Sequence, residues 1–170
     1  IESSTRQTGI WSLVSILSTL TASSSPDVKI SSNGQAIAVW HSVSSGSDII
    51  QSNLLTISTN TWGIVKTVTP ASPAFHFNYP KVAIDSNGNA TAIGYRYNYN
   101  STTGSYYNVQ VLASSLTSGA ASWSLLPTVL SGNGIGNPAH LSLRIRADAN
   151  GDVLAVWTNL YDGMTYTIES

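Results

Sequence analysis

Two short segments place oxygen-bearing side chains at every second residue, a spacing by which a loop can surround a calcium ion. They are Asp85-x-Asn87-x-Asn89 and Asp148-x-Asn150-x-Asp152. An EF-hand places its glycine at the sixth position, whereas glycine stands at the fourth position here. The corresponding earlier segment carries Ser31 and Gln35, which are poor calcium ligands. The pattern favours an Asx-type turn, with a metal site as the alternative.

Histidine and acidic residues form no recognisable catalytic pattern. His76 and His140 each follow a proline-containing stretch ahead of a predicted strand, and His41 follows another predicted strand. No carboxylate pattern accompanies them, so we expect loop packing rather than a metal site or a general base. There is no Gly-x-Ser-x-Gly elbow and no Ser/His/Asp order, and the acidic residues fall mostly in turns or at strand ends, which disfavours a glycosidase or lyase. The sequence predicts neither an enzyme nor a cofactor.

Aromatic residues are the main candidates for binding. The segment 95–107 alternates tyrosine with polar residues, and tyrosine offers a large contact area with a hydrogen-bonding tip. The candidate ligand-binding residues are Trp40, Trp157, Tyr95, Arg96, Tyr97, Tyr99, Tyr106 and Tyr107. The alternative for the tyrosines is cross-strand pairing on a solvated ribbon. For the tryptophans the alternative, which we favour, is packing between sheets.

Three recurring motifs show that the chain is built from copies of one unit. A triplet of the Ile-Gln-Ser type starts at residues 1, 50, 111 and 168, which are 49, 61 and 57 residues apart. Between successive triplets come a tryptophan and then an Asn-Gly pair. The tryptophans are Trp11, Trp62 and Trp123, and the pairs are Asn33-Gly34, Asn87-Gly88 and Asn150-Gly151. A period of roughly 40–60 residues that holds several short strands is typical of propeller blades.

Residues 1–170 are therefore interpreted as a single all-β propeller segment of about three blade equivalents, two whole and one split between the termini. The repeats cover approximately 1–49, 50–110 and 111–167, with a fourth triplet at 168–170. The distance from Asn-Gly to the next triplet is 24 residues in the second copy, against 17 and 18 in the others. The tyrosine-rich hairpin is thus longer than its counterparts.

Each copy is predicted to contain four antiparallel strands and no helix. The first strands are predicted at 27–30, 81–84 and 144–147, and the second at 35–40, 89–95 and 152–157. The third are predicted at 49–55, 108–116 and 166–170, and the fourth at 11–17, 62–68 and 123–130. Because Asn-Gly is the strongest short hairpin signal, we expect type I′ turns between the first and second strands.

These motifs resemble the bacterial tandem-repeat β-propellers. The matching residues are Trp11-Ser12, Trp123-Ser124, Asp85 to Asn89, Asp148 to Asp152, Ala38-Val39-Trp40, Ala155-Val156-Trp157 and Ile50-Gln51-Ser52. The resemblance covers nearly the whole chain and implies the fold, but little about function, because propellers include lectins, enzymes and scaffolds. One residue departs from the pattern: Gly94 stands where the neighbouring copies have Trp40 and Trp157. Either Tyr95 compensates or that blade has an open notch.

Composition narrows the possible partners. Charged residues make up 9% of the chain and the net charge is −1, which disfavours nucleic acid because phosphates require a basic patch. No apolar run approaches the roughly 20 residues of a membrane span, so no membrane insertion is expected. Few charges with many Ser, Thr, Asn and Tyr residues favour an extracytoplasmic or secreted location.

The leading hypothesis is a non-catalytic binding propeller that recognises a glycan or a protein surface through repeated aromatic and amide grooves. The alternative is a structural segment of a larger secreted repeat protein with no small-molecule ligand. Three copies are fewer than the four to eight blades of a propeller. We therefore expect self-association of two chains into a six-bladed ring, or further blades in a longer chain.

Overall fold

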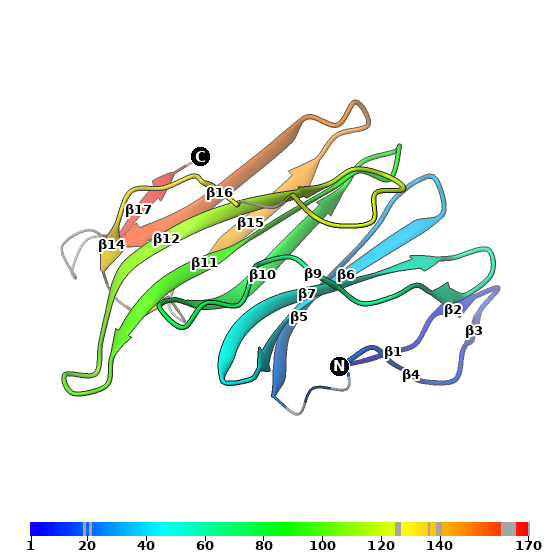
Figure 1. The fold of residues 1–170 in the computed structure, drawn as a ribbon. Coiled ribbons are helices and arrows are strands. Elements are labelled where there is room, and N and C mark those ends of the chain that lie inside the picture. Colours follow the sequence, from blue (N-terminus) through cyan, green and yellow to red (C-terminus); the bar gives the residue numbers. More distant parts are fainter. Residues whose placement is uncertain are drawn as a thin grey trace.

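The computed structural model describes residues 1–18, 20, 22–124, 127–135, 137–138, 141–160 and 166–169. The described residues contain no α-helix and form several antiparallel sheets, none of which closes on itself (Figure 1). The expected all-β class is confirmed. No helix in this part of the chain has the length and apolar character of a membrane span.

Two five-stranded sheets follow one pattern, in which three long strands pair in chain order and two short strands pair with the third. The first sheet comprises β5 (Ser23–Ile30), β6 (Gln35–Ser44) and β7 (Ser47–Thr56), followed along β7 by β8 (Thr61–Trp62) and β9 (Lys66–Thr67). The second sheet comprises β10 (His76–Ile84), β11 (Ala90–Asn100) and β12 (Ser105–Leu116), with β13 (Thr128–Val129) and β14 (Gly134–Ile135) along β12. The two sheets therefore repeat one strand order.

The remaining strands form partial copies at either end. The third sheet comprises β15 (Leu143–Ala147), β16 (Val153–Leu160) and β17 (Tyr166–Glu169). The N-terminal hairpin, residues 1–17, comprises β1 (Glu2–Ser3), β2 (Arg6–Gln7), β3 (Ile10–Trp11) and β4 (Ser15–Ile16), with β1 on β4 and β2 on β3. In the repeat, this hairpin corresponds to a third and a fourth strand.

The predicted first, second and third strands are confirmed in all three copies, although most strands extend further than predicted. The last predicted third strand ends at Ser170, which lies outside the described residues. The prediction of continuous fourth strands is wrong. The segment 62–68 pairs with β7 only at its two ends, through β8 and β9, and 11–17 is likewise divided between β3 and β4. Alternation of apolar and polar residues is weak evidence for a strand at the outer edge of a sheet, because neither pairing nor burial requires that pattern there.

The predicted type I′ turns are also wrong. Positive φ occurs at Gly34, Gly88 and Gly151 but not at the preceding asparagines. The Asp85 amide donates to the Asn89 carbonyl oxygen (2.9 Å) and the Gly88 amide to the Asp85 carbonyl oxygen (3.2 Å), which defines a three-residue loop that ends in a left-handed glycine.

The side chain of Asp85 selects this loop. Its Oδ1 accepts hydrogen bonds from the backbone amides of Asn87 and Asn89, both at 2.8 Å. Its Oδ2 accepts one from the side-chain amide of Asn89, also at 2.8 Å. Burial alone would raise the pKa of Asp85, but these hydrogen bonds outweigh it, and the pKa is lowered. The same backbone pattern occurs at Asp148. The structure therefore has the Asx-type turn that the sequence favoured over a calcium loop.

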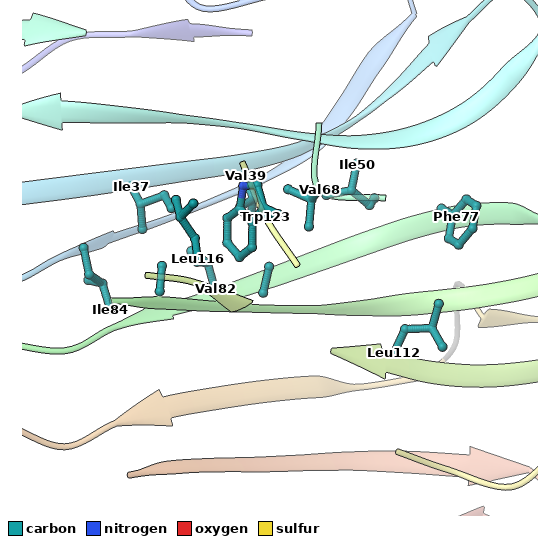
Figure 2. Close-up of a cluster of buried hydrophobic side chains, with 12 residues drawn as sticks. Ile37, Val39, Ile50, Val68, Phe77, Val82, Ile84, Leu112, Leu116 and Trp123 are labelled. Atoms are coloured by element: carbon teal, nitrogen blue, oxygen red, sulfur yellow. The ribbon is translucent and has the colours of Figure 1, made fainter. Parts of the chain in front are cut away.

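The sheets stack face to face, with the second sheet buried on both sides. β10 contacts β5, β6 and β7 on one side and β15 on the other. Figure 2 shows the core between the first two sheets, where Trp123 lies among aliphatic side chains of both. A second core joins the second and third sheets, and a small third core joins the N-terminal hairpin to the first sheet. The order of packing is thus N-terminal hairpin, first, second and third sheet.

Both ends of this stack expose apolar side chains. Val28 and Ile30 of β5 are 56% and 70% exposed, whereas their repeat equivalents on β10, Val82 and Ile84, are 0% and 9% exposed. At the opposite end, Leu154 of β16 is 61% exposed. The difference arises because a whole sheet covers Val82 and Ile84, whereas only the narrow N-terminal hairpin precedes β5.

Candidate ligand-binding surfaces

The tyrosine hairpin, residues 96–108, joins β11 to β12 and extends past the ends of the neighbouring strands (Figure 1). Tyr99 and Tyr106 are direct cross-strand partners with ring centroids 4.9 Å apart. Tyr106 also contacts the edge of Tyr97 at 5.4 Å, and Tyr97 stacks on His76 at 5.4 Å with 19° between the ring planes. The four rings form one aromatic row.

The row is anchored at its inner end and exposed at its outer end. Tyr97 and Tyr106 pack partly on the core between the second and third sheets. Burial, together with the nearby Asp48 carboxylate and Tyr79, raises the pKa of Tyr97 to about 12, so its hydroxyl remains protonated at neutral pH. Tyr99 and Tyr107 are each 43% exposed. The anchored rings Tyr97 and Tyr106 thus support the exposed ring of Tyr99, an arrangement that suits a binding surface.

Arg96 lies on the opposite face of the hairpin strand, over the Phe75 ring at 4.6 Å from its centroid. Its Nη2 donates to the Oε1 of Gln110. Cation–π contact and a hydrogen bond to an amide hold the side chain in one place. Arg96 therefore packs at the base of the tyrosine hairpin and is not part of the aromatic row that contains Tyr97, Tyr99 and Tyr106.

Three of the predicted site residues lie in the core instead of on a surface. Trp40, Tyr95 and Trp157 are 0%, 1% and 5% exposed. The Nε1 of Trp40 donates to the Oε1 of Gln51 at 3.2 Å, and the Tyr95 hydroxyl lies 3.1 Å from the carbonyl oxygens of Ser142 and Thr158. These side chains join neighbouring sheets and offer no face on which a ligand could stack.

The tryptophans at the start of the predicted fourth strands differ in exposure, depending on which sheet packs against them. Trp123 is 3% exposed and donates to the Ser52 hydroxyl of the first sheet at 2.8 Å. Trp62 packs partly on the N-terminal hairpin, and Trp11, which no earlier sheet of this chain covers, is 65% exposed. Equivalent positions therefore do not form equivalent grooves.

One groove of about 540 Å³ does lie beside Trp62, between the outer edges of the first and second sheets. Its polar lining consists of Gln35, Thr56, Thr59, Thr61 and Lys66. Hydroxyl and amide groups beside an indole can bind sugar hydroxyls. The aromatic and amide grooves expected from the sequence thus find one counterpart in the shallow groove beside Trp62.

A hydrogen-bonded chain of polar residues, which the sequence did not predict, ties the first two sheets together. The Nε2 of His41 lies 2.6 Å from the Oδ1 of Asp48, whose other oxygen contacts the Nδ1 of His76 on β10. The Nδ1 of His41 lies 3.1 Å from the Ser24 hydroxyl. Asp48 is diagonal to His41 across a hairpin that turns at Ser45-Gly46, and this register is the signal that could have revealed the contact.

These contacts bring Ser24, His41 and Asp48 together, although the sequence pattern did not predict that they would meet. Asp48 is shared between two imidazoles of different sheets, which makes it an inter-sheet link. His140 lies outside the described residues. Within the described ranges, no group of three or more histidine or acidic side chains is arranged to hold a metal ion.

Comparison with known proteins gives no family for this chain. No protein-family model matches it, and no curated protein matches it significantly. The assignment of function therefore depends on the geometry of these surfaces.

Proposed function

We propose that this chain is a segment of a secreted or extracytoplasmic β-propeller that acts as a non-catalytic binding module for a glycan or a protein surface. The support for the propeller is that two sheets repeat one strand order and stack face to face with their first strands adjacent. The bulges before Asp27 and Lys81 add to it, because each contains an X-Pro pair with positive φ, at Ser25 and Tyr79. Repeated irregularities of this kind are features of a family of blades.

The observation that carries the binding role is the aromatic row of the tyrosine hairpin. Tyr99, the outer ring of the row, is exposed, and so is Tyr107, which lies outside the row on the same hairpin. The inner rings Tyr97 and Tyr106 are fixed by packing. Asn98 and Asn108, joined by a 3.1 Å hydrogen bond, supply amide groups beside them. Exposed aromatic faces with adjacent amides suit both sugars and protein surfaces. The groove beside Trp62 is the second surface of this kind.

Deletion of residues 98–105, with Tyr97 and Tyr106 rejoined through Asn-Gly, is expected to abolish binding and leave the fold intact. Outside the hairpin, the deleted residues bond to the described part of the chain through Asn98, which donates to the Ala74 carbonyl oxygen at 2.5 Å, and a shorter loop costs less closure entropy. The measurements are glycan-array and pull-down binding, together with the melting temperature.

The double variant Tyr99→Ala/Tyr107→Ala is the matched test, since it keeps the hairpin and removes only the exposed rings. Thr102→Ala/Thr103→Ala, at the tip of the same hairpin, is the control and should bind normally. Retention of every parental ligand by the tyrosine double variant would contradict the proposal. Absence of any ligand for the parent protein would favour the structural-segment alternative.

The exposed apolar residues at both ends of the stack support ring closure. We expect two chains to form a six-bladed ring, in which the partner's terminal strands complete each split blade and cover Val28 and Ile30. Light scattering at micromolar concentration should give a mass of about 36 kDa, twice the 18.0 kDa of one chain. A stable 18.0 kDa species would contradict this ring and favour further blades in a longer chain.

A further inference from the structure

Four of the seven cationic side chains of this protein surround one hollow. The hollow has a volume of about 230 Å³ and lies where the first strands of the three sheets meet. Its charged lining consists of Asp27, Lys29, Lys81, Arg144 and Arg146. The seven cations are spread along the sequence. Lys81 and Arg144 nevertheless occupy the position of Asp27 in the next two repeats, and the stacking of the sheets brings these three positions together.

Asp27 neutralises only part of this charge. Its Oδ2 accepts the Val82 amide at 3.0 Å, which ties β5 to β10, and its Oδ1 lies 3.3 Å from the Nζ of Lys29 and 4.0 Å from that of Lys81. Arg144 and Arg146 are exposed and form no ion pair within the part of the chain that the structure describes.

The hollow thus carries four cations and one carboxylate, in a protein whose net charge is −1. Like charges around one space repel each other, and an anion in the hollow would relieve this repulsion. The Nη1 atoms of Arg144 and Arg146 donate to the Leu143 and Ile145 carbonyl oxygens, at 2.8 and 3.0 Å. These bonds fix each guanidinium through one group and leave other N–H donors for a ligand.

We propose that this hollow binds a tetrahedral oxyanion, the phosphate or sulfate group of an ester. Two guanidinium groups can each bind two oxygens of such a group, and two ammonium groups supply further charge. The volume has room for several water molecules, enough for one oxyanion and the start of its carrier. The site uses the first strands, on elements separate from the tyrosine hairpin, and it does not depend on the function proposed above.

Calorimetric titration at roughly 10 mM ionic strength, where the screening length is about 30 Å, tests the proposal. The probes are inorganic phosphate, inorganic sulfate, glucose 6-phosphate and glucose. We expect saturable binding of the three anions and none of glucose. Tighter binding of glucose 6-phosphate than of inorganic phosphate would identify a carrier-bound ester as the ligand, and equal binding would identify the free ion.

Arg144→Gln/Arg146→Gln is expected to weaken anion binding at least about tenfold, because it removes both guanidinium groups. Arg6→Gln is the matched control, since Arg6 is exposed, lies outside the hollow and has a side chain that donates to the Gly9 carbonyl oxygen. Both variants should melt like the parent. The hairpin deletion should bind phosphate normally, which separates this site from the tyrosine surface.

Asp27→Asn provides a second test, because a purely structural role of Asp27 would not predict a rise in affinity for phosphate. Asparagine can still accept the Val82 amide, but it removes the one negative charge, so affinity for phosphate should rise by a factor of about 3–10. The proposal is overturned if the parent binds none of the anions. Undiminished binding by Arg144→Gln/Arg146→Gln would overturn it as well.

Discussion

Replacement of Trp123 by alanine is expected to lower the free energy of unfolding by about 3–5 kcal/mol. The indole is 3% exposed and lies in the core between the first two sheets, among Val39, Val82 and Leu116 (Figure 2). Its Nε1 also donates to the buried Ser52 hydroxyl, which would lose its donor. Urea unfolding followed by circular dichroism would measure the change.

The equivalent residues of the other copies are the controls. Trp62→Ala should cost roughly 1–2 kcal/mol because the side chain is only partly buried, and Trp11→Ala should remain within about 0.5 kcal/mol. Equal losses at all three positions would show that exposure in a single chain does not describe the protein in solution. If the ring forms, the partner covers Trp11, and Trp11→Ala should weaken the dimer while leaving the unfolding of the monomer unchanged.

The first, second and third strands of each copy were predictable because the alternation of apolar residues and the turn signals agree there. Val82 and Ile84 face one core while Ala83 faces the other, as period-two alternation requires of a strand buried on both faces. Asp85 and Gly88 mark the turn, although the loop type followed from the Asp85 side chain and not from Asn-Gly alone. The outer strands lacked this agreement, since Ile64 and Val65 are apolar yet 76% and 41% exposed.

The functional surfaces were less predictable, because sequence spacing does not show which face of a strand is covered. Tyr95 and Tyr99 belong to the same alternating segment, but Tyr95 is buried in the core between the second and third sheets and Tyr99 is 43% exposed. The basic hollow depends on contacts between sheets separated by more than 50 residues. Asp48 and His76 meet for the same reason. Only the stacking of the sheets reveals these groups.

Gly94, the departure from the repeat pattern, is compensated by a residue on a neighbouring strand. Tyr95 does not compensate, because adjacent residues of a strand face opposite sides and Tyr95 packs toward the third sheet. Gly94 and Phe77 line the same small apolar cavity of about 10 Å³, so there is no open notch. The first sheet has Trp40 and Ser23 at the positions of Gly94 and Phe77. Large and small side chains are thus exchanged between the two strands.

Restoring tryptophan at position 94 is therefore expected to destabilise the protein, although the repeat pattern favours it. A β-carbon at Gly94 would already lie 3.4 Å from the Asn78 carbonyl oxygen, and the cavity is far smaller than an indole, so Gly94→Trp should cost about 1–3 kcal/mol or more. Phe77→Ser should cost about 3–5 kcal/mol, because it empties a buried site.

The double variant Phe77→Ser/Gly94→Trp recreates the arrangement of Ser23 and Trp40 in the first sheet, and it should be more stable than the sum of the single effects predicts. We expect a favourable coupling of about 0.5–3 kcal/mol, measured by a double-mutant cycle in urea. Phe77→Ser/Gly94→Ala is the control, because it adds only a methyl group and cannot fill the site. Additive effects in Phe77→Ser/Gly94→Trp would mean that the two sheets do not pack as equivalent units, and the interpretation of the chain as repeated blades would lose its main physical support.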